Sequence, residues 1–216
     1  MQNKKKKVAI AAAALLCAGV IGVGGAYAYF SGQSEVVENQ FTYVAGEQDK
    51  EGIVQIVEPD WNPENAKNLE PGETLAKDPY VHSDAEYESW VAMKVVIPKV
   101  NGDAPDTTEA FINLDWNTTD YTLLATEDNA DAVVYYYGYN TKLAAKADTS
   151  KLFTTMEFNK FTKIVEAGSG SVDVSAAVIQ SIDPDTGVEF PDVTTAWEKY
   201  LSTALGYETV ADAQAK

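Results

Sequence analysis

ESWVAMKVVIPK, residues 88–99, is the stretch that decides the fold. Its apolar residues alternate with residues of the other face: Val91, Met93, Val95 and Ile97. A period of two places every second side chain on the same face of a strand. The proline near the end of the run cannot continue a ladder of backbone hydrogen bonds, so it marks the strand's end. The stretch therefore predicts one β-strand that is half-buried against a core.

Similar stretches rich in Val, Thr and Tyr recur along the chain. They predict further strands over residues 52–58, 74–82, 121–126, 132–139, 153–158 and 171–182. Turn-forming residues lie between the strands at positions 101–103, 167–170 and 183–187. Strands that follow one another without regularly interleaved helices indicate an antiparallel sandwich. The predicted fold class is all-β, a jelly-roll-like antiparallel β-sandwich with one or two short peripheral helices.

One helix is predicted near the carboxyl end, over residues 195–205. Its apolar residues fall on one face at helical spacing: Trp197, Tyr200, Leu201, Ala204 and Leu205. Thr195 and Glu198 have the spacing of a capping box, and Gly206 stands where a helix often ends. Residues 140–151 are interpreted as either a second short helix or a loop.

The amino terminus has the features of a secretory signal peptide. Four lysines precede an apolar run over residues 8–26, and the run ends in Ala26-Tyr27-Ala28. We expect cleavage after Ala28, which makes Tyr29 the new amino terminus. The alternative is that the apolar run remains as a membrane anchor, but it contains four glycines and lacks a charged flank that would stop transfer. Lipidation of Cys17 is disfavoured because Leu16 precedes it.

Composition limits what the processed chain can do. Of 216 residues, 188 follow the predicted signal peptide (residues 1–28), and they contain no cysteine. All sixteen basic residues are lysines and four lie in the signal, so 12 positive charges face 33 negative ones, a net charge of −21. Such a chain repels nucleic acid and anionic membranes. It also repels its own copies, so self-assembly must depend on apolar and main-chain contacts and is eased by salt, acid or divalent cations.

Several blocks of the sequence follow one another in a specific order over nearly the whole chain: residues 26–31, Asn68 to Glu73, Lys77-Asp78-Pro79, 91–97, 135–137 with 152–153, and 177–180 with 196–197. Their order resembles the TasA and camelysin family, secreted matrix-fibre proteins of Gram-positive bacteria whose signal peptides are cut by a SipW-type peptidase. The resemblance implies a jelly-roll domain that polymerises by donor-strand exchange, in which the amino-terminal strand of one subunit completes the sheet of the next. The segment 183–190 and the loop around Asn101 depart from the family pattern.

The domain organisation follows from this reading: residues 29–44 form a donor-strand segment and residues 45–216 the sandwich domain. The residues expected to carry self-assembly are Tyr29, Phe30, Val37, Asn39, Phe41 and Tyr43. In residues 35–44, Val37, Phe41 and Tyr43 share one face, which suits docking of an extended strand against a sheet edge. The alternative is that this strand pairs within its own domain and leaves a monomer.

Three other kinds of functional site have weaker support in the sequence. Camelysin-type proteins have been described as metalloproteases, but a catalytic zinc site usually takes several histidines and this chain has only His82. Asp183, Asp185 and Glu189 form part of a calcium-loop pattern without its full spacing, which favours a solvated turn. The large aromatics could form a glycan platform, although core packing is the commoner role: Trp61, Trp90, Trp116 and Tyr135 to Tyr137. We expect no enzyme activity, cofactor or metal.

The sequence thus predicts a structural protein, secreted to the extracellular matrix or surface of a Gram-positive bacterium. Its expected partner is a second copy of itself, with an accessory or anchoring matrix protein as a further partner, and it binds neither nucleic acid nor, after cleavage, a membrane. The alternative is a monomeric adhesin or glycan-binding module. A camelysin-like metalloprotease is the third and weakest hypothesis.

Overall fold

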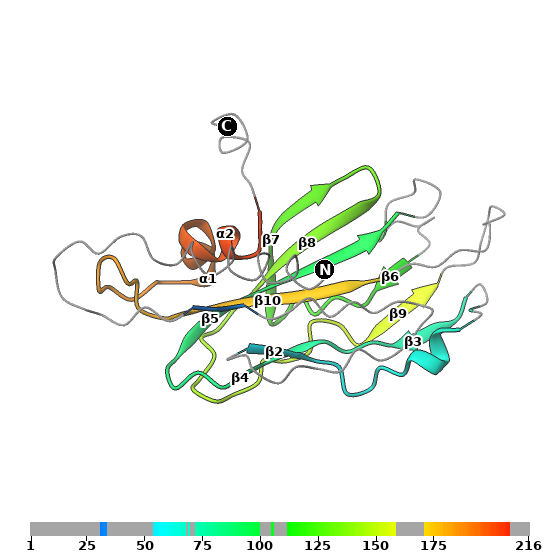
Figure 1. Ribbon diagram of the computed structural model, residues 1–216, viewed down its shortest axis with the longest axis horizontal. Coiled ribbons are helices and arrows are strands. Elements are labelled where there is room, and N and C mark those ends of the chain that lie inside the picture. Colours follow the sequence, from blue (N-terminus) through cyan, green and yellow to red (C-terminus); the bar gives the residue numbers. More distant parts are fainter. Residues whose placement is uncertain are drawn as a thin grey trace, which may run out of the picture.

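The structure, a computed structural model, describes residues 31–33, 54–67, 69, 72–99, 105, 112–158 and 171–207 (Figure 1). The predicted signal peptide and the six predicted self-assembly residues lie outside these ranges. Within them the chain forms an antiparallel β-sandwich with a short helical segment on one outer face. The predicted all-β class is confirmed.

One layer of the sandwich is a five-stranded antiparallel sheet. Its spatial order is β1 (Ser31–Gln33), β10 (Asp173–Gln180), β5 (Ser89–Pro98), β8 (Ala132–Tyr139) and β7 (Tyr121–Asp128). The alternating stretch of residues 88–99 therefore contains the central strand, β5. The edges are β1 on one side and β7 on the other.

The second layer consists of two smaller antiparallel sheets, which lie together on one side of the large sheet in Figure 1. One pairs β2 (Val54–Val57) with β4 (Tyr80–Ser83). The other has the order β3 (Thr74–Ala76), β9 (Thr155–Phe158) and β6 (Ile112–Leu114). A 3₁₀ turn, η1 (Pro63–Ala66), follows β2.

The predicted strand over residues 74–82 is in fact two strands, β3 and β4, which belong to different sheets. Lys77, Asp78 and Pro79 separate them. The Lys77 side chain is fully buried and its Nζ donates to Glu58 Oε1 at 2.8 Å, while Asp78 Oδ2 pairs with Lys151 Nζ at 2.7 Å. Burial lowers the pKa of Lys77, against the opposing effect of Glu58. The strand breaks where these charged side chains turn inward to meet partners.

The main hydrophobic core lies between the two layers. The alternating residues of β5 point into it, together with apolar side chains from β10 and the small sheets. β5 was predicted to be half-buried, with its other face exposed. That face is also covered, because Trp90 and Ala92 are buried beneath the carboxyl-terminal helical segment. The central strand is thus buried on both faces over its first half, which is what two-sided coverage of a sheet produces.

The helical segment covers the outer face of the large sheet (Figure 1). It consists of α1 (Val193–Ala196), a π-helical stretch η2 (Trp197–Leu201) and α2 (Ser202–Ala204). The predicted cap is wrong: the segment begins after Asp192, whose carboxylate accepts from the Thr195 backbone N–H. Gly206 ends it with a φ of 73°, as predicted. Residues 140–151 contain no helix.

Candidate assembly edge

Ser31 to Gln33, two residues after the predicted mature amino terminus at Tyr29, form an edge strand. β1 runs antiparallel to β10, with Ser31 opposite Ile179, Gly32 opposite Val178 and Gln33 opposite Ala177. In Figure 1 it is the short blue strand beside the orange β10. In a single chain, therefore, these three residues complete the sheet of their own subunit. The contacts that define a strand pair are main-chain contacts, so a second copy of β1 can make the same set.

The opposite edge of the sheet has a different construction. β7 pairs with β8 over its whole length, and the register shifts by one residue between Leu123 and Ala125. A bulge of this kind twists an edge and disfavours addition of another strand. Glu127 and Asp128 end the strand with negative charge, and Asp128 forms an ion pair with Lys99. Of the two edges, β7 carries the features that proteins use to prevent pairing.

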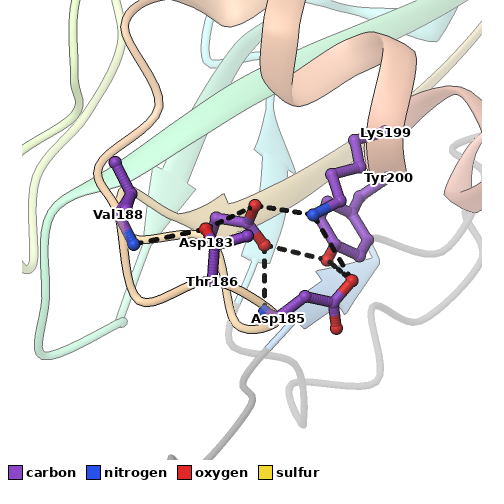
Figure 2. Close-up of polar contacts among 6 residues, drawn as sticks. All are labelled: Asp183, Asp185, Thr186, Val188, Lys199 and Tyr200. Carbon is purple, nitrogen blue, oxygen red and sulfur yellow. Dashed lines mark hydrogen bonds and ion pairs between the residues drawn. The ribbon is translucent and has the colours of Figure 1, made fainter.

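A polar cluster fixes the turn that follows β10 (Figure 2). The Asp183 carboxylate accepts from the Asp185 backbone N–H at 2.9 Å and from the Thr186 hydroxyl at 2.9 Å. Lys199 Nζ donates to the same carboxylate at 2.6 Å. The Tyr200 hydroxyl lies 2.7 Å from Asp185 Oδ2 and 3.0 Å from Asp183 Oδ1. The turn at the end of β10 is thereby fastened to the helical segment.

These contacts shift the ionisation of the cluster. Burial alone would raise the pKa of Asp183, but the donors from Lys199, Asp185 and Thr186 outweigh it and lower that pKa to about 2. Lys199 has its pKa raised, first by its hydrogen bond to Asp183. The turn that was predicted at these residues is present. It is not fully solvated, because the side chain of its first acidic residue, Asp183, is buried and the residue is only 7% exposed.

The calcium hypothesis finds no support in this geometry. Glu189, the third member of the predicted set, pairs with Lys142 Nζ at 2.5 Å instead of facing Asp183. Within the described ranges, no three His, Cys, Asp or Glu side chains are grouped so that they could hold a metal ion.

His82 lies on β4, half-exposed, and is an ordinary surface residue with two acidic neighbours. Its Nδ1 lies 2.6 Å from Asp148 Oδ1 and its Nε2 lies 3.4 Å from Asp84 Oδ1. The hydrogen bond with Asp148 is the main reason that the pKa of His82 is raised.

The aromatic residues considered as a glycan platform lie mostly in the core, the role that the sequence favoured. Trp90, Tyr136 and Tyr137 are buried, and Trp61, Trp116 and Tyr135 pack at the margin of the core. Trp116 stacks on Tyr137 with ring centroids 4.7 Å apart. Trp116 also contacts Tyr135, with ring centroids 5.3 Å apart, so these three rings pack on one another and do not form an open platform.

The predicted site residues Ala26, Ala28, Tyr29, Phe30, Val37, Asn39, Phe41 and Tyr43 are outside the described residues, so their positions stay predictions. Residues 31–33 lie within the predicted donor-strand segment 29–44, but the sequence did not identify β10 as their partner. The only available signal was their position directly after the aromatic pair. Among the helices of the described ranges, none has the length and apolar character needed to span a bilayer.

Comparison of the chain with protein-family models, with curated proteins and with solved structures found no match.

Proposed function

We propose that the chain is a secreted structural protein whose processed form assembles into extracellular matrix fibres by exchanging its amino-terminal strand between copies. The observation that supports this proposal is the edge position of β1. Ser31 to Gln33, which follow the predicted cleavage site after Tyr29 and Phe30, join the sheet at its edge by pairing with β10. Strand exchange keeps every such pair and only changes which copy supplies the strand.

The connection of β1 to the rest of the fold also supports exchange. Residues 34–53 lie between β1 and β2 in the sequence, and the partner of β1 in the sheet, β10, is far from it along the chain, so no short turn holds β1 to its neighbour. By contrast, β7 is joined to β8 by residues 129–131, with the Asn129 N–H donating to the Ala132 carbonyl at 2.9 Å. A strand held by so short a turn cannot leave its partner for another copy.

Processing is the step that would start assembly. The predicted signal peptide precedes Ser31 by only Tyr29 and Phe30. As long as the apolar leader is attached, the strand end remains tethered to the membrane, and cleavage frees it. Because the mature net charge is −21, assembly is expected to be faster at higher salt, which screens repulsion between copies.

A reversible lock on β1 tests the proposal. The processed chain has no cysteine, so Gln33→Cys with Ala177→Cys introduces one pair of thiols at directly opposite positions. Opposite residues of antiparallel strands have Cα atoms about 4.5–5.5 Å apart, within the range that a disulfide bridges. The double variant is oxidised as a dilute monomer and then concentrated.

We expect the locked monomer to form no fibres in electron micrographs, and the same sample to form them after reduction. Each single variant serves as a control and should assemble under both conditions. Fibres that grow equally well from the locked protein would contradict the proposal.

A further inference from the structure

The turn after β10 exposes aliphatic side chains while it buries its first carboxylate. Ile182 is 48% exposed and Val188 is 64% exposed. Among the described residues, the only other large hydrophobic side chain with comparable exposure is Leu123, on the far edge strand β7. Two of three such side chains therefore belong to one short turn. We refer to residues 182–188 as the apolar turn.

The apolar turn is already ordered by the rest of the molecule. The Asp183 N–H donates to the Val188 carbonyl at 2.8 Å, and the Gly187 N–H donates to the Asp183 carbonyl at 2.8 Å. Gly187 has a φ of 68°, a conformation that glycine adopts without strain. The bonds from Lys199 and Tyr200 add a connection to the helical segment (Figure 2). A surface that is fixed before binding loses little conformational entropy when a partner docks.

The register of β1 places this turn next to the assembly edge. Because the strands are antiparallel and Ser31 lies opposite Ile179, chain positions before 31 correspond to positions after 179 on β10. β10 ends at Gln180 and the apolar turn begins two residues later. A strand that docks on β10 in this register therefore brings its own leading residues toward the apolar turn.

We propose that the apolar turn is the docking surface for the aromatic terminus, Tyr29-Phe30, of a second copy. This inference rests on the proposed function. Two large aromatic rings that begin a chain need apolar cover, and the turn offers aliphatic side chains at the end of the edge where they arrive. By binding the aromatic pair, the apolar turn selects one pairing register for the incoming strand. A shift of the register by one residue would place each side chain of that strand on the opposite face of the sheet.

Two measurements on the processed protein test this inference, with Leu123 as the matched control. Leu123 has the same exposed fraction as Ile182 but lies on the opposite edge. First, the critical concentration for fibre growth is measured for Ile182→Ser, Val188→Ser and Leu123→Ser. Loss of one partly exposed aliphatic contact should raise it by about three- to tenfold for the first two variants and leave the third unchanged.

Second, proximity is measured by mixing two cysteine variants. Protein carrying Ser31→Cys, which keeps both aromatic residues, is mixed with protein carrying either Val188→Cys or Leu123→Cys, allowed to assemble, and treated with a short bis-maleimide linker. We expect crosslinked pairs of different chains with the first partner and a background yield with the second.

The outcomes separate the two proposals. Fibres with equal effects of the three serine variants and equal crosslink yields would overturn the docking surface and leave strand exchange intact. Processed wild-type protein that forms no fibres at any salt concentration would overturn strand exchange and the docking surface with it. Higher yield at position 188 together with raised critical concentrations for the two turn variants would support both.

Discussion

The two edges of the five-stranded sheet differ in length, in their connection to the chain and in what fixes them. β1 has three residues and is joined to β2 by residues 34–53. β7 has eight residues, a bulge, a charged end and a short turn into β8. Its first residue, Tyr121, is buried in the main core. One edge is thus part of the cooperative core, while the other is a short addition to it. An edge that can be exchanged must be separable without unfolding the domain.

The largest effect on stability is expected at Tyr121, on the β7 edge of the large sheet. Its ring packs against Tyr139 with centroids 5.2 Å apart, and its hydroxyl donates to the Ser150 carbonyl at 2.6 Å. Tyr121→Ala should lower the free energy of unfolding by about 3–5 kcal/mol. Tyr121→Phe, which keeps the ring, should cost about 1 kcal/mol. Urea denaturation measures both free energies of unfolding. If Tyr121→Ala were less destabilising than Tyr121→Phe, the β7 edge would not be part of the folded core.

The next effect is expected where the helical segment approaches β8. A Cβ added at Gly138 would lie 2.7 Å from a Val193 methyl and 2.9 Å from a Leu124 methyl. Gly138→Ala should therefore lower the free energy of unfolding by about 1–3 kcal/mol through overpacking.

Val193→Ala provides the matched test of that contact. If crowding is the cause, the double variant Gly138→Ala/Val193→Ala should be less destabilised than the sum of the two single changes. Strict additivity in thermal unfolding would contradict the close approach.

A smaller, pH-dependent effect on stability is expected at Asp183, in the turn that follows β10, the strand on which β1 lies. The folded pKa of Asp183, about 2, lies below its ordinary value of 3.8, so its stabilising contribution is fully present above pH 3.8. That contribution is lost as the pH falls toward about 2. The melting temperatures of wild type and Asp183→Asn should therefore differ by a constant amount above about pH 5 and converge in acid.

Tyr121→Phe is the control for this comparison at the β7 edge, because the hydroxyl that it removes carries no charge between pH 2 and pH 5: burial raises the pKa of Tyr121. A gap between Asp183→Asn and wild type that stays unchanged down to pH 2 would mean that the charge of Asp183 does not hold the turn.

The smallest effect is expected at His82, which lies on β4, in the other layer from both edges. Its folded pKa is raised by Asp148, so its contribution to stability is fully present below its ordinary pKa of 6.5 and is lost as pH rises through the higher folded value. In an NMR titration, Asp148→Asn should lower the pKa of His82. Fibre growth between pH 6 and pH 8 should not depend on His82→Ala, and a strong dependence would implicate this residue in assembly.

The strands of the core could be predicted from sequence because alternation is a local signal. β8 has the predicted bounds, 132–139, and β5 differs from the prediction by one residue at each end. β6 was missed because three residues, 112–114, are too few to show a period. The helix start was misplaced because Thr195 resembles a cap, whereas Asp192 is the residue that caps the segment. Both predicted and actual caps carry an oxygen that accepts a backbone N–H, and sequence alone does not rank them.

The candidate edge could be predicted only in part. The sequence predicts a processing site and an aromatic terminus, and both stay predictions, whereas the neighbours of β10 depend on how distant strands are ordered in the sheet. Similarly, Lys77 was predicted to lie within a strand. In the structure its charged side chain is buried against Glu58, and β3 ends at the residue before it, Ala76. Local patterns define elements, whereas edges and buried ion pairs are set by long-range packing.

The clearest test mixes two processed proteins of different mass tag, one carrying only Gln33→Cys and the other only Ala177→Cys. Because neither chain can form an internal disulfide, a bond between the two tags requires β1 of one copy to lie on β10 of another. If strands are exchanged, oxidised fibres contain disulfide-linked heterodimers that reduction dissolves. Fibres that form without such heterodimers would show that β1 stays in its own subunit and that copies join by another surface.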